Sequence, residues 1–203
     1  MIAIVDYGVG NLFSVEKAFV KLGADAVVTS DAAVIARADK LVLPGVGAFG
    51  DCMKNLTASG LIPAILAVIA EKKPLLGICV GLQILFEGSE ESPEAKGLGI
   101  FKGQVRKIRA EGLKIPHMGW NSLEFSSPRR SLDLFKNLPA ASYVYFVHSF
   151  QAVPEDKSIV TASATYGECI TAAVARDNVM ATQFHPEKSG DVGLAILKNF
   201  IEG

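Results

Sequence analysis

Cysteine is scarce in this sequence of 203 residues, and the few cysteines present do not pair. The three of them are odd in number, far apart and without a Cys-x-x-Cys motif. This pattern indicates neither a disulfide framework nor a zinc site. The three histidines also lack the spacing of metal ligands, so we predict no metal and no cofactor.

An excess of charge of either sign is also missing. The 20 Lys and Arg residues nearly balance the 21 Asp and Glu residues, which leaves a net charge of −1. A general electrostatic attraction to nucleic acid or to an anionic membrane is therefore not expected. One basic cluster stands out, formed by Lys102, Arg106, Lys107 and Arg109. We interpret it as the solvated face of a strand pair, with a docking surface as the alternative.

Long hydrophobic runs are absent as well. The longest, residues 61–70, is interrupted by Pro63 and is too short to cross a bilayer. The apolar run at residues 1–5 meets Asp6 at once, without the basic segment or cleavage site of a signal peptide. We therefore predict a cytoplasmic protein without a membrane association.

What the sequence does have is enough apolar material for one well-buried domain, since half of its residues are hydrophobic. We expect a single domain over residues 1–203. Its first half alternates two patterns: continuous apolar runs, and helical patterns such as the one that begins after Asn11 and ends at Gly23. Buried strands joined by helices predict an α/β fold with a mostly parallel sheet covered by helices on both faces. The strands are expected at residues 1–5, 26–29, 40–43 and 74–78.

The second half changes character. Strand-like runs follow one another with short turns between them, which predicts antiparallel strands added to the same sheet. These runs cover residues 103–108, 142–150, 158–165 and 171–174. Ser189 is then expected to cap a closing helix whose apolar positions include Val192, Ile196 and Phe200.

The first candidate for chemistry is the segment Gly77-Ile78-Cys79-Val80-Gly81, which lies between an apolar strand and a predicted helix. This form is typical of a nucleophile elbow, with Cys in place of the usual Ser. The glycines allow a sharp turn that exposes the side chain at the carboxyl edge of the sheet, and the helix would aim its amino end at the sulfur. On the elbow alone, an inert buried cysteine remains equally open.

A cysteine nucleophile needs a base, and the segment Gln183-Phe184-His185-Pro186-Glu187 supplies one. Residues two apart on a strand project on the same face, so Glu187 is expected to orient the ring of His185 toward Cys79. Pro186 places the segment at a strand end or edge. A surface turn is the alternative for this segment taken by itself.

Acyl transfer also requires donors for an oxyanion. The amide of Val80 follows the nucleophile directly and is one candidate. The other is the loop at residues 44–47, Pro-Gly-Val-Gly, which follows the third strand and would lie beside the elbow.

A competing motif is Gly8-Val9-Gly10-Asn11 after the first strand, which has part of a dinucleotide-binding pattern, with Asp31 near the place of a ribose-binding acid. Phe13 stands where that pattern needs its third glycine, which argues against a dinucleotide site. Cys52 and Cys169 lack both a glycine elbow and a neighbouring base, so we interpret them as core or surface residues.

With Cys79, His185 and Glu187 identified, the chain resembles the class I glutamine amidotransferases, which combine a Gly-x-Cys-x-Gly elbow with a later His-Pro-Glu. Three stretches narrow the resemblance to the glutaminase subunits of imidazole glycerol phosphate synthase. They are MIAIVDYGVGNLFSVEKAF at the start, LPGVGAFGDCM at residues 43–53 and PHMGWN at residues 116–121. The likeness covers essentially the whole chain.

The resemblance implies hydrolysis of L-glutamine to glutamate and ammonia, with Cys79 acylated as a γ-glutamyl thioester. It places the oxyanion amides at Val46 and Val80, with a peptide at Gly45-Val46 that reorients when the partner binds its ligand. It also implies a glutamine pocket, formed by Gly47, Gln83, Glu91, His148, Ser149 and Phe150. Phe150 departs from the pattern, since a related position can carry Tyr.

The resemblance further implies a heterodimer with a cyclase subunit, a HisF-type (β/α)8 barrel that receives the ammonia through a channel. The residues implied to face this partner are Asn11, Trp120, Tyr145 and Lys188. Three alternatives stay open: a glutaminase serving another synthase, a non-catalytic binding module, and a cysteine peptidase. The PHMGWN stretch argues against the first, the intact triad against the second and the resemblance against the third.

Overall fold

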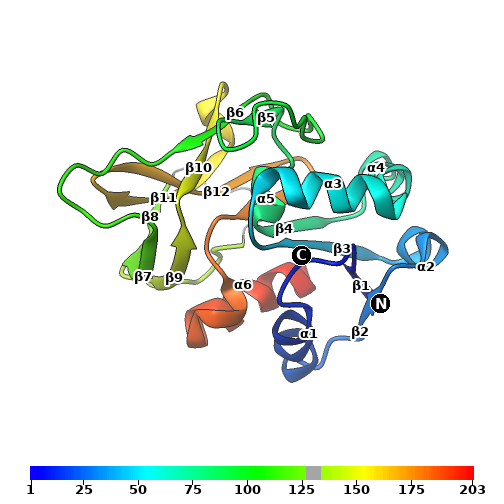
Figure 1. Cartoon of the computed structure of the whole chain (residues 1–203). Coiled ribbons are helices and arrows are strands. Elements are labelled where there is room, and N and C mark those ends of the chain that lie inside the picture. The colour runs from blue at the N-terminus through cyan, green and yellow to red at the C-terminus, as the bar shows by residue number, and fades with distance from the viewer. Residues whose placement is uncertain (127–133) are drawn as a thin grey trace.

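The structure is a computed structural model that describes residues 1–126 and 134–203. An eight-stranded sheet runs through the molecule in the order β2-β1-β3-β4-β13-β12-β11-β8 (Figure 1). Its strands are β1 (Ile2–Val5), β2 (Ala26–Thr29), β3 (Lys40–Gly45), β4 (Leu75–Cys79), β8 (Glu124–Phe125), β11 (Val160–Tyr166), β12 (Glu168–Arg176) and β13 (Val179–Thr182).

The first five strands of this order are parallel, and the four expected from the first half of the sequence are all among them. Every residue of β1, β4 and β13 is buried, as expected for strands covered on both faces. The sequence analysis did not assign β13 as a strand, yet it pairs with β4 in the centre of the sheet.

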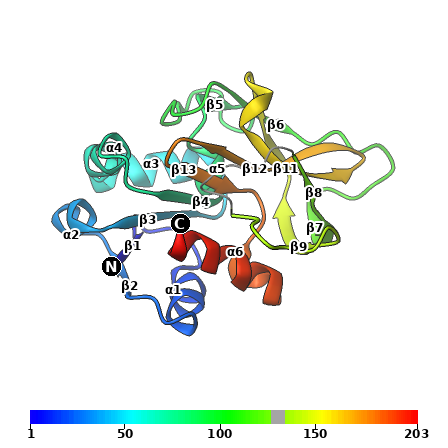
Figure 2. The ribbon, with the colours of Figure 1, turned by 180° about the vertical axis from the view of Figure 1, so that it is seen from behind.

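Helices cover both faces of the sheet, as predicted. Figures 1 and 2 show α3 and α4 on one face and α1 and α6 on the other. The helices are α1 (Leu12–Lys21), α2 (Ala32–Arg37), α3 (Phe49–Ser59), α4 (Ile62–Ala70), α5 (Val80–Gln83) and α6 (Gly190–Glu202), with 3-10 turns η1 (Lys157–Ile159) and η2 (Pro186–Lys188). Lys40 ties the sheet to the end of α6, because its ammonium donates to the carbonyls of Phe200 and Ile201 at 2.9 and 2.7 Å.

Two helix caps differ from the prediction. Asn11 and Ser189 do precede α1 and α6, but neither side chain bonds to the first turn of its helix. The expected side-chain caps are therefore wrong. By contrast, Asp31 caps α2 by accepting a hydrogen bond from the Ala33 amide at 2.7 Å. Its carboxylate therefore has a structural role at the start of this helix.

The second half of the chain is only partly as predicted. Strands β12, β11 and β8 do extend the main sheet in antiparallel fashion. The expected strand at residues 142–150 instead breaks into two strands that join two further sheets, of order β10-β6-β5 and β7-β9. These are β5 (Gly88–Ser89), β6 (Gly103–Lys107), β7 (His117–Ser122), β9 (Tyr143–His148) and β10 (Phe150–Pro154). The prediction of a single extended sheet is wrong for them, and β5 pairs with β6 in parallel.

Part of the basic cluster lies on β6, as a strand-face interpretation requires. The guanidinium of Arg106 is 3.1 Å from a carboxylate oxygen of Glu168, whose other oxygen accepts from the Arg109 amide at 2.7 Å. In the described ranges no single helix is long and apolar enough to cross a membrane; α3 and α4 pass that test only as a pair, bent by 91°.

Candidate active site

Cys79 is the last residue of β4 and has the backbone geometry of an elbow, with φ of 57° and ψ of −113°. This conformation is costly for a residue with a side chain and is typical of a constrained turn. The neighbouring glycines are required by close packing. A Cβ at Gly81 would collide with the Leu43 carbonyl oxygen, and one at Gly77 would come within 2.9 Å of the Gly81 carbonyl oxygen. Neither position has space for a larger residue.

The helix after the elbow begins where it was predicted, directly after Cys79. It is the single turn α5, and a helix of four residues sums few aligned peptide dipoles. The amino end of α5 lies at Cys79, as predicted, but the dipole of so short a helix is small. The side chains of His185 and Gln183 also face the sulfur.

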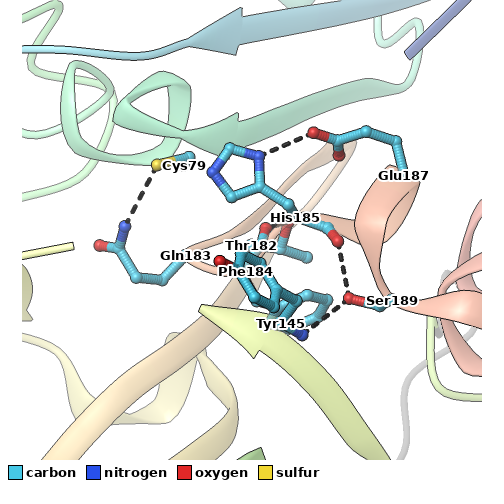
Figure 3. Close-up of polar contacts among 8 residues, drawn as sticks. All are labelled: Cys79, Tyr145, Thr182, Gln183, Phe184, His185, Glu187 and Ser189. Atoms are coloured by element: carbon cyan, nitrogen blue, oxygen red, sulfur yellow. Dashed lines mark hydrogen bonds and ion pairs between the residues drawn. The ribbon is translucent and has the colours of Figure 1, made fainter. Parts of the chain in front are cut away.

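His185 lies just after the end of β13 and directly before the turn η2. Its Nδ1 is 2.7 Å from an oxygen of Glu187, and both side chains are almost fully buried. Figure 3 shows the imidazole between Glu187 and Cys79, with its other nitrogen facing the sulfur. That nitrogen, Nε2, forms no hydrogen bond to any residue in the described part of the chain.

The two residues are not on one strand, as we had assumed, because Glu187 lies in the turn η2. The 3-10 turn brings the carboxylate back toward the ring, so the expected pair forms for a different reason. Burial lowers the pKa of His185, but the Cys79 sulfur and the Glu187 carboxylate outweigh it and raise that pKa to about 9. At neutral pH this favours the imidazolium form of His185.

A cavity of about 490 Å³ opens beside the sulfur, and most of the predicted site residues line it. Glu187 lies behind His185 and does not line the cavity. Trp120 and Tyr145 do not line it either. Pro116 and Val147 line the cavity without having been predicted. The predicted residues in its wall are Asn11, Val46, Gly47, Cys79, Val80, Gln83, Glu91, His148, Ser149, Phe150, His185 and Lys188.

The loop after β3 lies against the elbow, since Gly45 pairs with Cys79 in the register of β3 and β4. Hydrogen bonds hold the peptides on both sides of Gly45-Val46. The Tyr7 hydroxyl donates to the Pro44 carbonyl at 2.7 Å, and the Cys52 thiol donates to the Val46 carbonyl at 3.4 Å. Burial raises the pKa of Cys52 to about 11, so this thiol stays protonated and can donate.

The part of the cavity wall that contains His148 and Phe150 is held by a chain of hydrogen bonds. The donor and the acceptor of each bond in this chain are fixed. His148 Nδ1 lies 2.8 Å from the Phe150 carbonyl, which can only accept, so Nδ1 carries the proton. His148 Nε2 must then accept from His117 Nδ1 at 3.0 Å, and His117 Nε2 accepts from the Asn121 amide at 3.2 Å. Burial lowers the pKa of both histidines to about 4, which keeps the pair neutral as this pattern requires.

The side-chain amides of Gln83 and Gln183 connect this part of the wall to Cys79. Gln83 donates from Nε2 to the Phe150 carbonyl and to Gln183 Oε1, each at 3.1 Å. The amide of Gln183 is thereby turned so that its Nε2 faces the Cys79 sulfur at 3.9 Å (Figure 3). Glu91 is also engaged, because it accepts from the Phe49 amide at 2.8 Å.

Sequence reasoning missed several residues that act on this site. Gln183 stands two positions before His185, and that spacing was the available signal. Cys52 was interpreted as a core or surface residue; it is buried, but it also bonds to the loop beside the elbow, while Cys169 is exposed. His117 and Tyr7 carried no local signal, because only tertiary contacts reveal their partners.

Comparison with known proteins shows the family to which the chain belongs. The family model described as glutamine amidotransferase class-I matches residues 3–203. The imidazole glycerol phosphate synthase subunit HisH of Syntrophotalea carbinolica is 55% identical, with 98% of each chain covered. The subunit of the same name from Geobacter metallireducens is 52% identical, over 98% of this chain and 96% of its own.

A solved structure described as a glutamine amidotransferase superposes with a TM-score of 0.77 at 21% identity, covering 100% of this chain and 98% of its own. At that identity the likeness supports the fold alone. The predicted fold class is thus confirmed by a family model and by a solved structure. Because the family match extends over nearly the whole sequence, the chain belongs to the class I glutamine amidotransferase family.

Proposed function

We propose that this chain is the glutaminase subunit of an imidazole glycerol phosphate synthase, with residues 1–203 forming one amidotransferase domain. It would hydrolyse L-glutamine to glutamate and ammonia as part of histidine biosynthesis in the cytoplasm. The observation that carries the proposal is the buried series Cys79, His185 and Glu187, of which Cys79 and His185 line a cavity of about 490 Å³. The name shared by relatives that are 55% and 52% identical supports the choice of synthase.

In the proposed reaction the Cys79 sulfur attacks the side-chain amide carbon of glutamine. A C–S bond forms, and the carbonyl electron pair moves to an oxyanion that accepts hydrogen bonds from the amides of Val46 and Val80. His185 gives its proton to the leaving nitrogen, so the C–N bond breaks and ammonia departs. Water, deprotonated by His185, then attacks the thioester, which releases glutamate and restores the sulfur.

The raised pKa of His185 suits the first half of this cycle, because the imidazolium is the acid that the leaving nitrogen needs. Glu187 accepts from Nδ1 and so keeps Nε2 facing the sulfur. The proposed pocket for glutamine is the cavity wall formed by Gly47, Gln83, Glu91, His148, Ser149 and Phe150. The Phe150 side chain cannot form a polar contact, but its carbonyl orients both Gln83 and His148.

The proposed partner is a HisF-type (β/α)8-barrel cyclase, which would use the ammonia to make imidazole glycerol phosphate and the aminoimidazole carboxamide ribonucleotide. The surface around Trp120 supports a partner, since Trp120 is 57% exposed and its neighbour Met118 is 61% exposed. The Tyr145 ring packs edge-on against Trp120, with the ring centres 6.1 Å apart. Asn11 and Lys188, also exposed, lie at the cavity and are proposed to face the same partner.

Glutamate release by the purified chain, alone and with a cyclase subunit and its nucleotide ligand, tests the proposal. We expect strong activation in the full mixture, because the amide of Val46 would complete the oxyanion site only when the Gly45-Val46 peptide reorients. High activity of the chain alone would contradict a site gated by the partner. Glutamine hydrolysis that the cyclase leaves unchanged would contradict the choice of synthase.

Two further experiments, a substitution and a chemical label, test the nucleophile. Cys79→Ala should abolish glutamine hydrolysis and leave the complex able to use free ammonia. A glutamine-like chloroketone should label Cys79, which lines the cavity, and spare both the buried Cys52 and the exposed Cys169. Labelling of Cys169 at an equal rate would show simple exposure instead of recognition by the pocket.

A further inference from the structure

Ser189 occupies the position of a helix cap but does not act as one. It immediately precedes α6 and is only 1% exposed, yet its hydroxyl forms no bond to the first turn of that helix. Ser at this position ordinarily accepts from an amide two or three residues later. The hydroxyl has therefore been diverted to other partners.

Those partners are the backbones of two other segments. The Ser189 hydroxyl donates to the His185 carbonyl at 2.6 Å and accepts from the Tyr145 amide at 2.9 Å. Both directions are fixed, because a carbonyl can only accept and an amide N–H can only donate. A third bond closes the arrangement, since the His185 amide donates to the Tyr145 carbonyl at 3.0 Å.

These three bonds hold the backbone of His185 from both sides against strand β9. Figure 3 shows Ser189 between Tyr145 and His185, on the side of the imidazole away from Cys79. The His185 carbonyl also accepts from the Lys188 amide at 3.0 Å, which keeps the turn η2 closed. The Tyr145 amide has the Ser189 hydroxyl as its partner at this junction, so losing the hydroxyl would leave a half-buried donor without that bond.

We propose that Ser189 is a positioning residue for His185. By joining the base to β9, it holds the imidazole where one nitrogen meets Glu187 and the other faces Cys79. The assignment of His185 as the base rests on the proposed function, whereas the geometric role of Ser189 does not.

The junction also connects the base to the aromatic pair of Tyr145 and Trp120, of which Trp120 is exposed. The peptide of Tyr145 is bonded to His185 through Ser189, while its ring packs against the exposed Trp120. A shift of β9 caused by docking on that pair would therefore be passed to the backbone of His185. Ser189 supplies one of the two connections through which such a shift acts on the base, and the direct bond from the His185 amide to the Tyr145 carbonyl is the other.

The test compares Ser189→Ala with Ser189→Thr, which keeps a hydroxyl, in the full chain with its cyclase partner. Ser142→Ala is the matched control, because Ser142 is equally buried and donates to a carbonyl, that of Pro139, at 2.7 Å. We expect Ser189→Ala to lower kcat about tenfold or more with little change in KM for glutamine, since a displaced base loses transition-state contacts. Ser189→Thr should keep most of kcat, and the control should keep all of it.

A second readout needs no turnover. The His185 ring, followed by NMR in the protein without glutamine, should titrate at a lower pH in Ser189→Ala, because the imidazole moves away from the Cys79 sulfur and the Glu187 carboxylate. An unchanged titration together with an unchanged kcat would overturn the proposal and leave Ser189 a packing residue. A Thr variant as impaired as the Ala variant would overturn it too, since the hydroxyl would then not be the cause.

A replacement variant covers a failure to fold, and the NMR comparison covers a failure of the proposed function. If Ser189→Ala does not fold, Ser189→Cys replaces it, with a weaker donor of similar size and the same expected direction. If the wild-type chain hydrolyses no glutamine, the proposed function fails, but the NMR comparison still decides whether Ser189 positions His185.

Discussion

Replacing His117 by Phe offers a quantitative test of the neutral histidine pair. The His117 ring is stacked between Phe146 and Tyr166, with ring centres at 4.6 and 4.1 Å. Phe has nearly the same shape, so the stack should persist. The substitution removes one titrating group and the hydrogen bond that His117 gives to His148.

The magnitude follows from the pKa of each histidine, which burial lowers from 6.5 to about 4. A group whose folded pKa is lowered resists protonation in the folded state. Stability is therefore complete above pH 6.5 and is lost as the pH falls toward 4. Between pH 7 and pH 5 each histidine costs about 2 kcal/mol of the free energy of unfolding, so the pair costs about 4 kcal/mol.

His117→Phe should reduce this loss to about 2 kcal/mol, because only His148 remains to be protonated. Urea unfolding at pH 7, 6 and 5 measures the difference between wild type and variant. The comparison at pH 7 isolates packing and the lost hydrogen bonds, about 1–3 kcal/mol, since protonation hardly contributes there. His185 has a raised pKa and opposes the trend, but it is present in both proteins and cancels. Equal pH dependence in the two proteins would refute the claim that His117 is held neutral by burial.

Three further substitutions test the site. Glu187→Gln should lower kcat about 100-fold or more, because His185 loses its anionic partner; near-native turnover would contradict the orienting role. Gln183→Leu removes the N–H that faces Cys79, so alkylation of that sulfur at pH 7 should slow about tenfold; an unchanged rate would show that the donor has no effect. Gly81→Ala should cost about 2 kcal/mol or more in urea unfolding, since its Cβ meets a strand carbonyl; a cost near zero would contradict the close packing of the elbow.

Where a site depends on local patterns, the sequence predicts it well. The strands β1, β3 and β4 are apolar runs, and parallel strands bring their carboxyl ends to one edge. The elbow at Cys79 and the loop near Gly45 both lie at such ends. Their contact follows from the order of the sheet, in which β3 and β4 are neighbours.

Where a site depends on pairings between distant segments, local patterns fail. Residues 142–150 alternate like one strand, yet the chain turns at Ser149, so that β9 and β10 join different sheets. The His148 ring bonds to the Phe150 carbonyl two residues later, across that turn. A periodic pattern reports which residues are buried and carries no information on which strand will pair with them.

The same limit explains the failed cap at Ser189, and it bears on how the base is held. A serine before a helix has a local partner in the first turn, which is all that a sequence pattern can register. In the folded chain the Ser189 hydroxyl instead meets the His185 carbonyl and the Tyr145 amide, and a buried backbone group without a partner costs more than an open helix end that water can solvate. The hydroxyl therefore serves the junction between β9 and the base. A departure from a local rule next to a proposed base is where positioning residues should be sought, because there the tertiary requirement has outweighed the local one.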